Sequence, residues 1–161
     1  MEDLTVFLEA VETSLQNNVA LLNWAAALKA DEPGSAGEWW VQLGNDQYEV
    51  AIPLSHYPFV LVTVGNETSR EEGAMGELIS RMFKFQVGFF DNNTRRGTLR
   101  SVELEKVFAL EVFRALRDLM VGPDNPDGLI VDFRIDPILT DQDVNRPAIL
   151  RMIPVEVDYT L

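Results

Sequence analysis

The chain has 161 residues, with 13 Lys and Arg against 26 Asp and Glu, no Cys, and a formal net charge of -13. This length suits one folded domain, and the absence of Cys excludes disulfides, thiolate zinc sites and cysteine nucleophiles. The acidic excess opposes binding to a phosphate backbone. The acidic first residues and the lack of a long apolar run predict a protein made in a cytoplasm, with no secretory signal and no membrane span.

The first 31 residues have a helical pattern. Apolar residues recur every three or four positions and alternate with Glu and Gln, which predicts an amphipathic helix. The pattern is interrupted at Asn17-Asn18, resumes at Val19 and ends before Pro33-Gly34. These residues are compatible with one bent helix or with two shorter ones. The apolar positions of the first part are Leu4, Phe7, Leu8, Val11 and Leu15.

Strand signals come after the helical segment. Two stretches at 38–44 and 47–52 are rich in aromatic and β-branched residues and flank a Gly-Asn-Asp turn, which predicts a hairpin. The nearly continuous apolar run at 57–64 is typical of a central strand covered on both faces. A further strand is predicted at 81–90, where apolar and polar residues alternate in the first half.

Between those last two strands, residues 65–76 are polar and contain three glycines. Such a segment cannot pack as core, so it predicts a long exposed loop or hairpin tip. A loop of this length inside a compact domain is usually functional or mobile.

The second half of the chain predicts one long helix and two strands. The helix is expected to be capped by Thr98 or Ser101 and to end at Met120, and the strands to occupy 129–136 and 148–159. Together these elements predict a single α+β domain over residues 1–161, in which an N-terminal helical segment and the long helix flank a mostly antiparallel sheet. A broad apolar face is predicted for the helix, from Val102, Leu104, Val107, Phe108, Leu110, Val112, Phe113, Leu116 and Leu119.

Motifs for catalysis are weak. His56 is the only histidine, and Ser55 beside it would point to the opposite face of an extended chain, so the two do not predict a catalytic pair. The carboxylates at 124–127 and 141–143 lack the calcium-loop spacing and are better explained as Asx-stabilised turns. The basic group Arg95, Arg96 and Arg100 predicts a solvated turn. We therefore expect no enzyme activity, no cofactor and no metal site.

The pattern from residue 57 onward resembles the tail terminator and tail-completion proteins of tailed bacteriophages. In that family an N-terminal helix precedes a strand that starts near a proline, then a second strand, a long helix and a final strand pair. The matching segments are Tyr57-Pro-Phe-Val-Leu-Val, Phe83-Lys-Phe-Gln-Val, the helix from Leu99 to Met120, Gly128-Leu-Ile-Val-Asp-Phe-Arg-Ile and Ala148-Ile-Leu-Arg-Met-Ile-Pro-Val-Glu-Val-Asp-Tyr. The resemblance covers about the last two-thirds of the chain.

This resemblance implies a virion structural protein at the head-proximal end of the tail, assembled in the host cytoplasm. It would form a ring, commonly of six subunits, that ends the tail tube, contacts the tail tube protein and the neck proteins, and lets DNA pass without specific binding. The alternatives left open are a neck or connector ring protein and a small host-side binding module. The expected contacts with a neighbouring subunit or the tube come from the 65–76 segment: Glu67, Arg70, Glu71, Glu72 and Met75.

Overall fold

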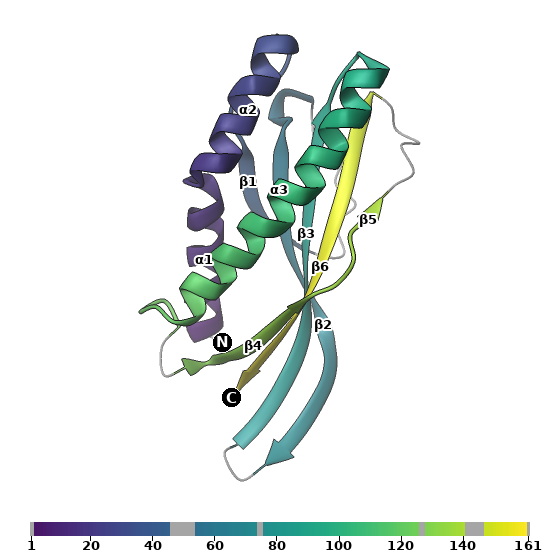
Figure 1. Ribbon diagram of the computed structural model, residues 1–161. Coiled ribbons are helices and arrows are strands. Elements are labelled where there is room, and N and C mark those ends of the chain that lie inside the picture. The colour runs from purple at the N-terminus through teal and green to yellow at the C-terminus, as the bar shows by residue number, and fades with distance from the viewer. Residues whose placement is uncertain (1, 46–53, 74–75, 126–127, 141–146, 161) are drawn as a thin grey trace.

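The computed structural model describes residues 2–45, 54–73, 76–125, 128–140 and 147–160. They form a two-layer α+β domain in which the helices cover one face of a six-stranded, mostly antiparallel sheet (Figure 1). The predicted fold class is confirmed. Among the described residues, none of the helices is both long and apolar enough to cross a membrane.

Two separate helices make up the N-terminal segment. α1 (Glu2–Gln16) is followed by α2 (Val19–Asp31). Asn18 lies between them and caps the second, because its side-chain Oδ1 accepts a hydrogen bond from the backbone N–H of Leu21 at 3.0 Å. The alternative left open by the periodicity is therefore resolved in favour of two helices.

The sheet has the order β1-β2-β3-β6-β4, with β5 also paired to β6. All the neighbouring strands are antiparallel except β1 and β2, which run parallel. The first half of the predicted hairpin at 38–52 is therefore a parallel edge strand, and its second half, 47–52, lies outside the described residues. The strand bounds are β1 Trp40–Asn45, β2 Phe59–Gly73, β3 Gly76–Phe90, β4 Ile130–Ile135, β5 Leu139–Thr140 and β6 Ala148–Thr160.

Polar side chains from α1 cover the free edge of β1. The carboxylate of Glu12 accepts a hydrogen bond from the backbone N–H of Leu43 at 2.9 Å. Gln16 donates its side-chain N–H to the carbonyl of Val41 at 3.4 Å. These two groups satisfy backbone positions that would otherwise be open to pairing with another strand.

The core lies between the helices and the sheet. Trp24 of α2 stacks on Trp39, with ring centroids 5.4 Å apart, and meets Phe89 of β3 edge-on at 5.1 Å. Such aromatic pairs add stability beyond the area they bury. Close packing also occurs between neighbouring strands, since a Cβ at Gly88 would lie 2.2 Å from the ring of Phe59, its cross-strand partner.

The long helix α3 spans Thr94–Met120 and begins earlier than predicted. Its cap is Asn93, whose side chain accepts from the Arg96 N–H at 2.9 Å, so the prediction of a cap at Thr98 or Ser101 is wrong. The end at Met120 is confirmed. Three members of the predicted apolar face are exposed instead of buried: Val102, Leu110 and Phe113.

Candidate functional site

Residues 65–76, predicted as a long exposed loop or hairpin tip, belong to a hairpin. They include the paired ends of β2 and β3, which continue up to the pair Gly73 and Gly76, so the loop alternative is wrong and the hairpin alternative agrees with the structure. We call residues 66–73 and their partners 76–81 the arm. Figure 1 shows the arm projecting beyond the lower end of the helical layer and past the C-terminal end of β6.

The β2 half of the arm has no buried face. The last eight residues of β2, 66–73, are all exposed. β1 pairs with β2 only as far as Val64, so the outer edge of β2 has no partner strand in the described structure from residue 65 onward. On the β3 half, Ile79 and Ser80 are buried where β6 pairs with them. The β3 half of the arm therefore packs against β6 at its base, whereas the β2 half is solvated along residues 66–73.

An ion-pair ladder links the two strands of the arm. Arg70 donates to Glu67, with Nη2–Oε1 at 2.5 Å, and to Glu77, with Nη1–Oε2 at 3.0 Å. Arg81 lies 3.9 Å from the same Glu67 carboxylate. The hydrogen bond from Arg70 lowers the pKa of Glu67 below its ordinary value, and the bonds to both glutamates raise the pKa of Arg70. The ladder therefore keeps these side chains charged.

The structure brings four of the five candidate interface residues together on the arm. Glu67 and Arg70 are engaged in the ladder, whereas Glu71 and Glu72 are exposed and form no ion pair with any described residue. The fifth, Met75, lies outside the described residues. The arm thus carries two uncompensated carboxylates toward the end farthest from the body.

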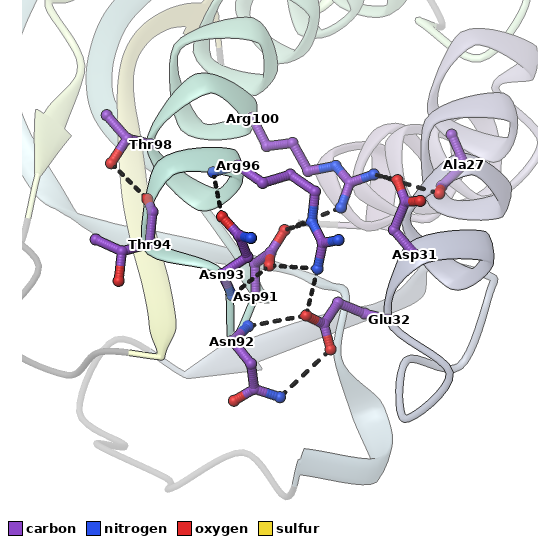
Figure 2. A network of polar contacts seen from close by, with 10 residues as sticks. All are labelled: Ala27, Asp31, Glu32, Asp91, Asn92, Asn93, Thr94, Arg96, Thr98 and Arg100. Carbon is purple, nitrogen blue, oxygen red and sulfur yellow. Dashed lines mark hydrogen bonds and ion pairs between the residues drawn. The ribbon is translucent and has the colours of Figure 1, made fainter.

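A second charged cluster lies at the other end of the helical layer, and the sequence did not reveal it. Its centre is Asp91, whose side chain is fully buried (Figure 2). Arg96 binds both of its oxygens, with Nε–Oδ2 and Nη2–Oδ1 each at 2.8 Å, and Arg100 donates to Oδ2 at 2.9 Å. The backbone N–H of Asn93 adds a fourth bond at 2.9 Å. The contact of Arg96 with Asp91 is bidentate, which is the strong form of an arginine–carboxylate interaction.

The same cluster joins the C-terminal end of α2 to the start of α3. Arg96 Nη2 donates to Glu32 at 2.6 Å, and Arg100 pairs with Asp31. The prediction of a solvated turn at these arginines is therefore wrong, because they lie on a helix and are engaged with carboxylates. Their spacing of four residues was the signal available in the sequence, since it places both side chains on one helix face. The partners on α2 are too far away in sequence to be recognised.

Burial and hydrogen bonding act in opposite directions on Asp91. Burial by itself raises the pKa of this carboxyl, but the bonds from Arg96, the Asn93 N–H and Arg100 together outweigh it, and the pKa lies well below its ordinary value. The group stays ionised at neutral pH. A carboxylate whose oxygens are both occupied in this way is poorly placed to act as a base or to bind an incoming ligand, so we assign this cluster to the fold.

The remaining chemical candidates are also structural. His56 lies in a short 3-10 turn (Leu54–His56) and stacks on Trp40, with ring centroids 4.5 Å apart. Asn125 is buried and donates to the carbonyls of Met120 and Ile130, so this amide side chain stabilises the loop after α3. Over the described ranges no group of acidic or histidine side chains is arranged to hold a metal ion, and 126–127 and 141–146 lie outside them.

A shallow hollow of about 340 Å³ lies between α2 and α3. Its wall includes Trp24, Arg100 and Glu103. The guanidinium of Arg100 is already engaged by Asp91 and Asp31, so it has little capacity left to bind an anion. The hollow therefore offers weak support for the host-side binding module.

No protein-family model matches this chain, and no curated protein sequence matches it either.

Proposed function

We propose that this chain is a ring-forming virion structural protein that ends the tail tube of a bacteriophage and provides the surface for joining the head. The ring is expected to be hexameric and to lie at the head-proximal end of the tail. The phage part of the proposal rests on the resemblance of the pattern from residue 57 onward. The ring part rests on one observation, the projecting arm.

The arm supports assembly because it extends about 25 Å from residue 66 to residue 73 without helices above it or a strand along its outer edge. A solvated two-stranded hairpin is marginally stable by itself. The ladder of Arg70 and its partners ties the two strands together, which favours a role as a preformed contact for a neighbour. A contact between an arm on one side of a subunit and a different surface of the next subunit produces a ring when the rotation closes.

The net charge of the chain also supports a ring through which DNA passes. A chain of net charge -13 presents like charge to DNA that passes through a ring. We therefore expect no binding to duplex DNA at physiological salt, which an electrophoretic shift assay measures. Micromolar, salt-sensitive binding would count against a DNA-passing ring of this kind.

Sedimentation across a concentration series tests the ring directly. We expect monomers to associate into one closed species, and negative-stain images to show rings that cap tubes assembled from the tail tube protein of the same genome. A neck protein would instead bind the head-side connector and leave tube ends bare. A single monomeric species at every concentration, with and without tubes, would overturn the proposal.

An arm variant sharpens this test. Replacing residues 71–78 by an Asn-Gly turn closes the hairpin at the pair Arg70 and Ile79 and keeps in place every apolar residue that is buried in the described part of the chain. The subunit should remain folded, with its far-ultraviolet spectrum nearly unchanged, while ring formation and tube capping are lost. The matched control is Glu67→Gln, which weakens the ladder but keeps the arm at full length and should still cap. Normal capping by the shortened protein would show that the arm is not the contact.

A further inference from the structure

The outward face of α3 carries an apolar stripe. Leu99, Val102, Leu110 and Phe113 are 56%, 62%, 45% and 43% exposed. Their spacing places them along one line of the helix, on the side away from the buried Leu104. Phe113, at the end of this line, also meets Phe133 of β4 edge-on, with ring centroids 5.6 Å apart. The stripe covers about 21 Å of the helix axis. A row of exposed apolar side chains on one helix face is a candidate contact with another molecule.

Two exposed basic residues lie on the same line of α3 as the stripe, in an otherwise acidic protein. α3 has six basic and four acidic residues, a net charge of +2, which leaves -15 for the rest of a chain whose total is -13. Arg95 precedes the stripe and Lys106 interrupts it. Both are exposed, and neither forms an ion pair within the part of the chain that the structure describes. The stripe therefore fits a partner surface with carboxylates and some apolar area.

The arm has the complementary charge. Residues 66–77 contain four glutamates and one arginine, and Glu71 and Glu72 are the two that the ladder leaves uncompensated. The arm is about as long as the stripe, at roughly 25 Å against 21 Å. The methylene groups of its Glu and Arg side chains can cover apolar surface while the charged ends reach the rim.

These two surfaces cannot satisfy each other within one molecule, because the arm points away from the helical layer (Figure 1). We propose that the arm of one copy docks on the outward face of α3 in the next copy, with Glu72 directed toward Arg95 and Lys106 and Glu71, on the opposite face of the strand, at the rim of the contact. This inference rests on the proposed ring and names its contact. The two surfaces differ, so the contact runs head to tail and can close into a ring.

Cross-linking tests the contact, since the chain contains no Cys of its own. Two single variants, Glu72→Cys and Val102→Cys, are mixed and treated with a short bis-maleimide. We expect a cross-linked dimer that forms only when both are present. The matched control pairs Glu72→Cys with Val6→Cys on α1, an apolar position that is 43% exposed, and should give no product. Equal yields from the two pairs would indicate random collision and overturn the contact.

A charge exchange provides the second measurement. Arg95→Glu with Lys106→Glu, or Glu71→Lys with Glu72→Lys, should each weaken association at least about tenfold in sedimentation, because like charges then face each other. The combination of all four changes should recover association to within about threefold of the original protein. If both charge-reversed variants form rings normally and Glu72→Cys gives no cross-linked product with Val102→Cys, this contact is overturned but the proposed ring is not. Absence of any oligomer in the unaltered protein would overturn both proposals.

Discussion

Two clusters in this molecule use the same chemistry in opposite surroundings. At Asp91 a buried carboxylate is held by Arg96 and Arg100, whereas on the arm the exposed Arg70 bridges Glu67 and Glu77. The first cluster connects the end of α2 to the start of α3, and the second connects two neighbouring strands. The difference in burial decides how much each cluster contributes to stability. A buried charge that loses a partner is left poorly solvated, whereas an exposed charge replaces its partner with water at little cost.

This difference separates residues that specify the fold from residues that remain available for a partner. Loss of an arginine from the Asp91 cluster leaves the carboxylates of Asp91 and Glu32, which are 0% and 8% exposed, with fewer partners in a place that water reaches poorly. Loss of one member of the arm ladder leaves its partners solvated. The contrast can be measured by equivalent substitutions in the two clusters.

The largest effect is expected at the buried cluster. Asp91→Asn removes the charge that Arg96 and Arg100 share, and should lower the free energy of unfolding by about 3 to 5 kcal/mol, the range for breaking a buried ion pair. Urea unfolding monitored by tryptophan fluorescence gives this value. Asp132→Asn, at an exposed position of β4, is the control and should change stability by less than about 0.5 kcal/mol. A loss below about 1 kcal/mol at Asp91 would contradict the role given to burial.

Acid provides a smaller and independent measure of the same cluster. The pKa of Asp91 is depressed in the folded protein, so its stabilising contribution is present above the ordinary value of 3.8 and is lost as the pH falls through the lower folded-state pKa. The stability difference between the unaltered protein and Asp91→Asn should therefore be constant from about pH 7 to about pH 5 and shrink below about pH 4. A difference that stays constant down to about pH 2.5 would mean that ionised Asp91 does not carry the effect.

The smallest effect is expected on the arm. Arg70→Gln removes both bridges of the ladder, yet should shift the melting temperature of the isolated subunit by no more than about 2 °C, because exposed ion pairs contribute little. The shift should disappear in about 0.5 M salt. A large loss of stability, insensitive to salt, would show that the arm is part of the folding core.

Periodicity predicted the elements whose side chains face one packed surface. The helix over residues 2–16 and the strand at 148–159 have a regular alternation of apolar and polar positions, and the structure agrees with them. The start of α3 could not be predicted, because Gly97 lowers the local preference of its first turns for helix. Contacts of Arg96 with Glu32 and Asp91 override that preference, and Glu32 is far away in sequence.

The candidate site was only partly predictable. The charge of 65–76 and the exposure of 66–73 were correctly inferred from composition, but the strand pairing was not, because the β2 half of the arm has no buried face to impose an alternating pattern. Three residues of the stripe, Val102, Leu110 and Phe113, were predicted to be core because they are apolar and recur at helical spacing. Val102 and Phe113 have the hydrophobicity of core residues, and a sequence does not show that they stay 62% and 43% exposed, although Phe113 also meets Phe133 of β4 edge-on.

The covered edge of β1 limits how this protein can aggregate. Glu12 and Gln16 occupy backbone groups of Leu43 and Val41 that a foreign strand would need. Growth of the sheet by strand addition is therefore blocked along β1 unless α1 detaches. A fibre built edge to edge through β1 is therefore disfavoured, and on this side of the sheet the described strands leave only the outer edge of the arm without a partner strand.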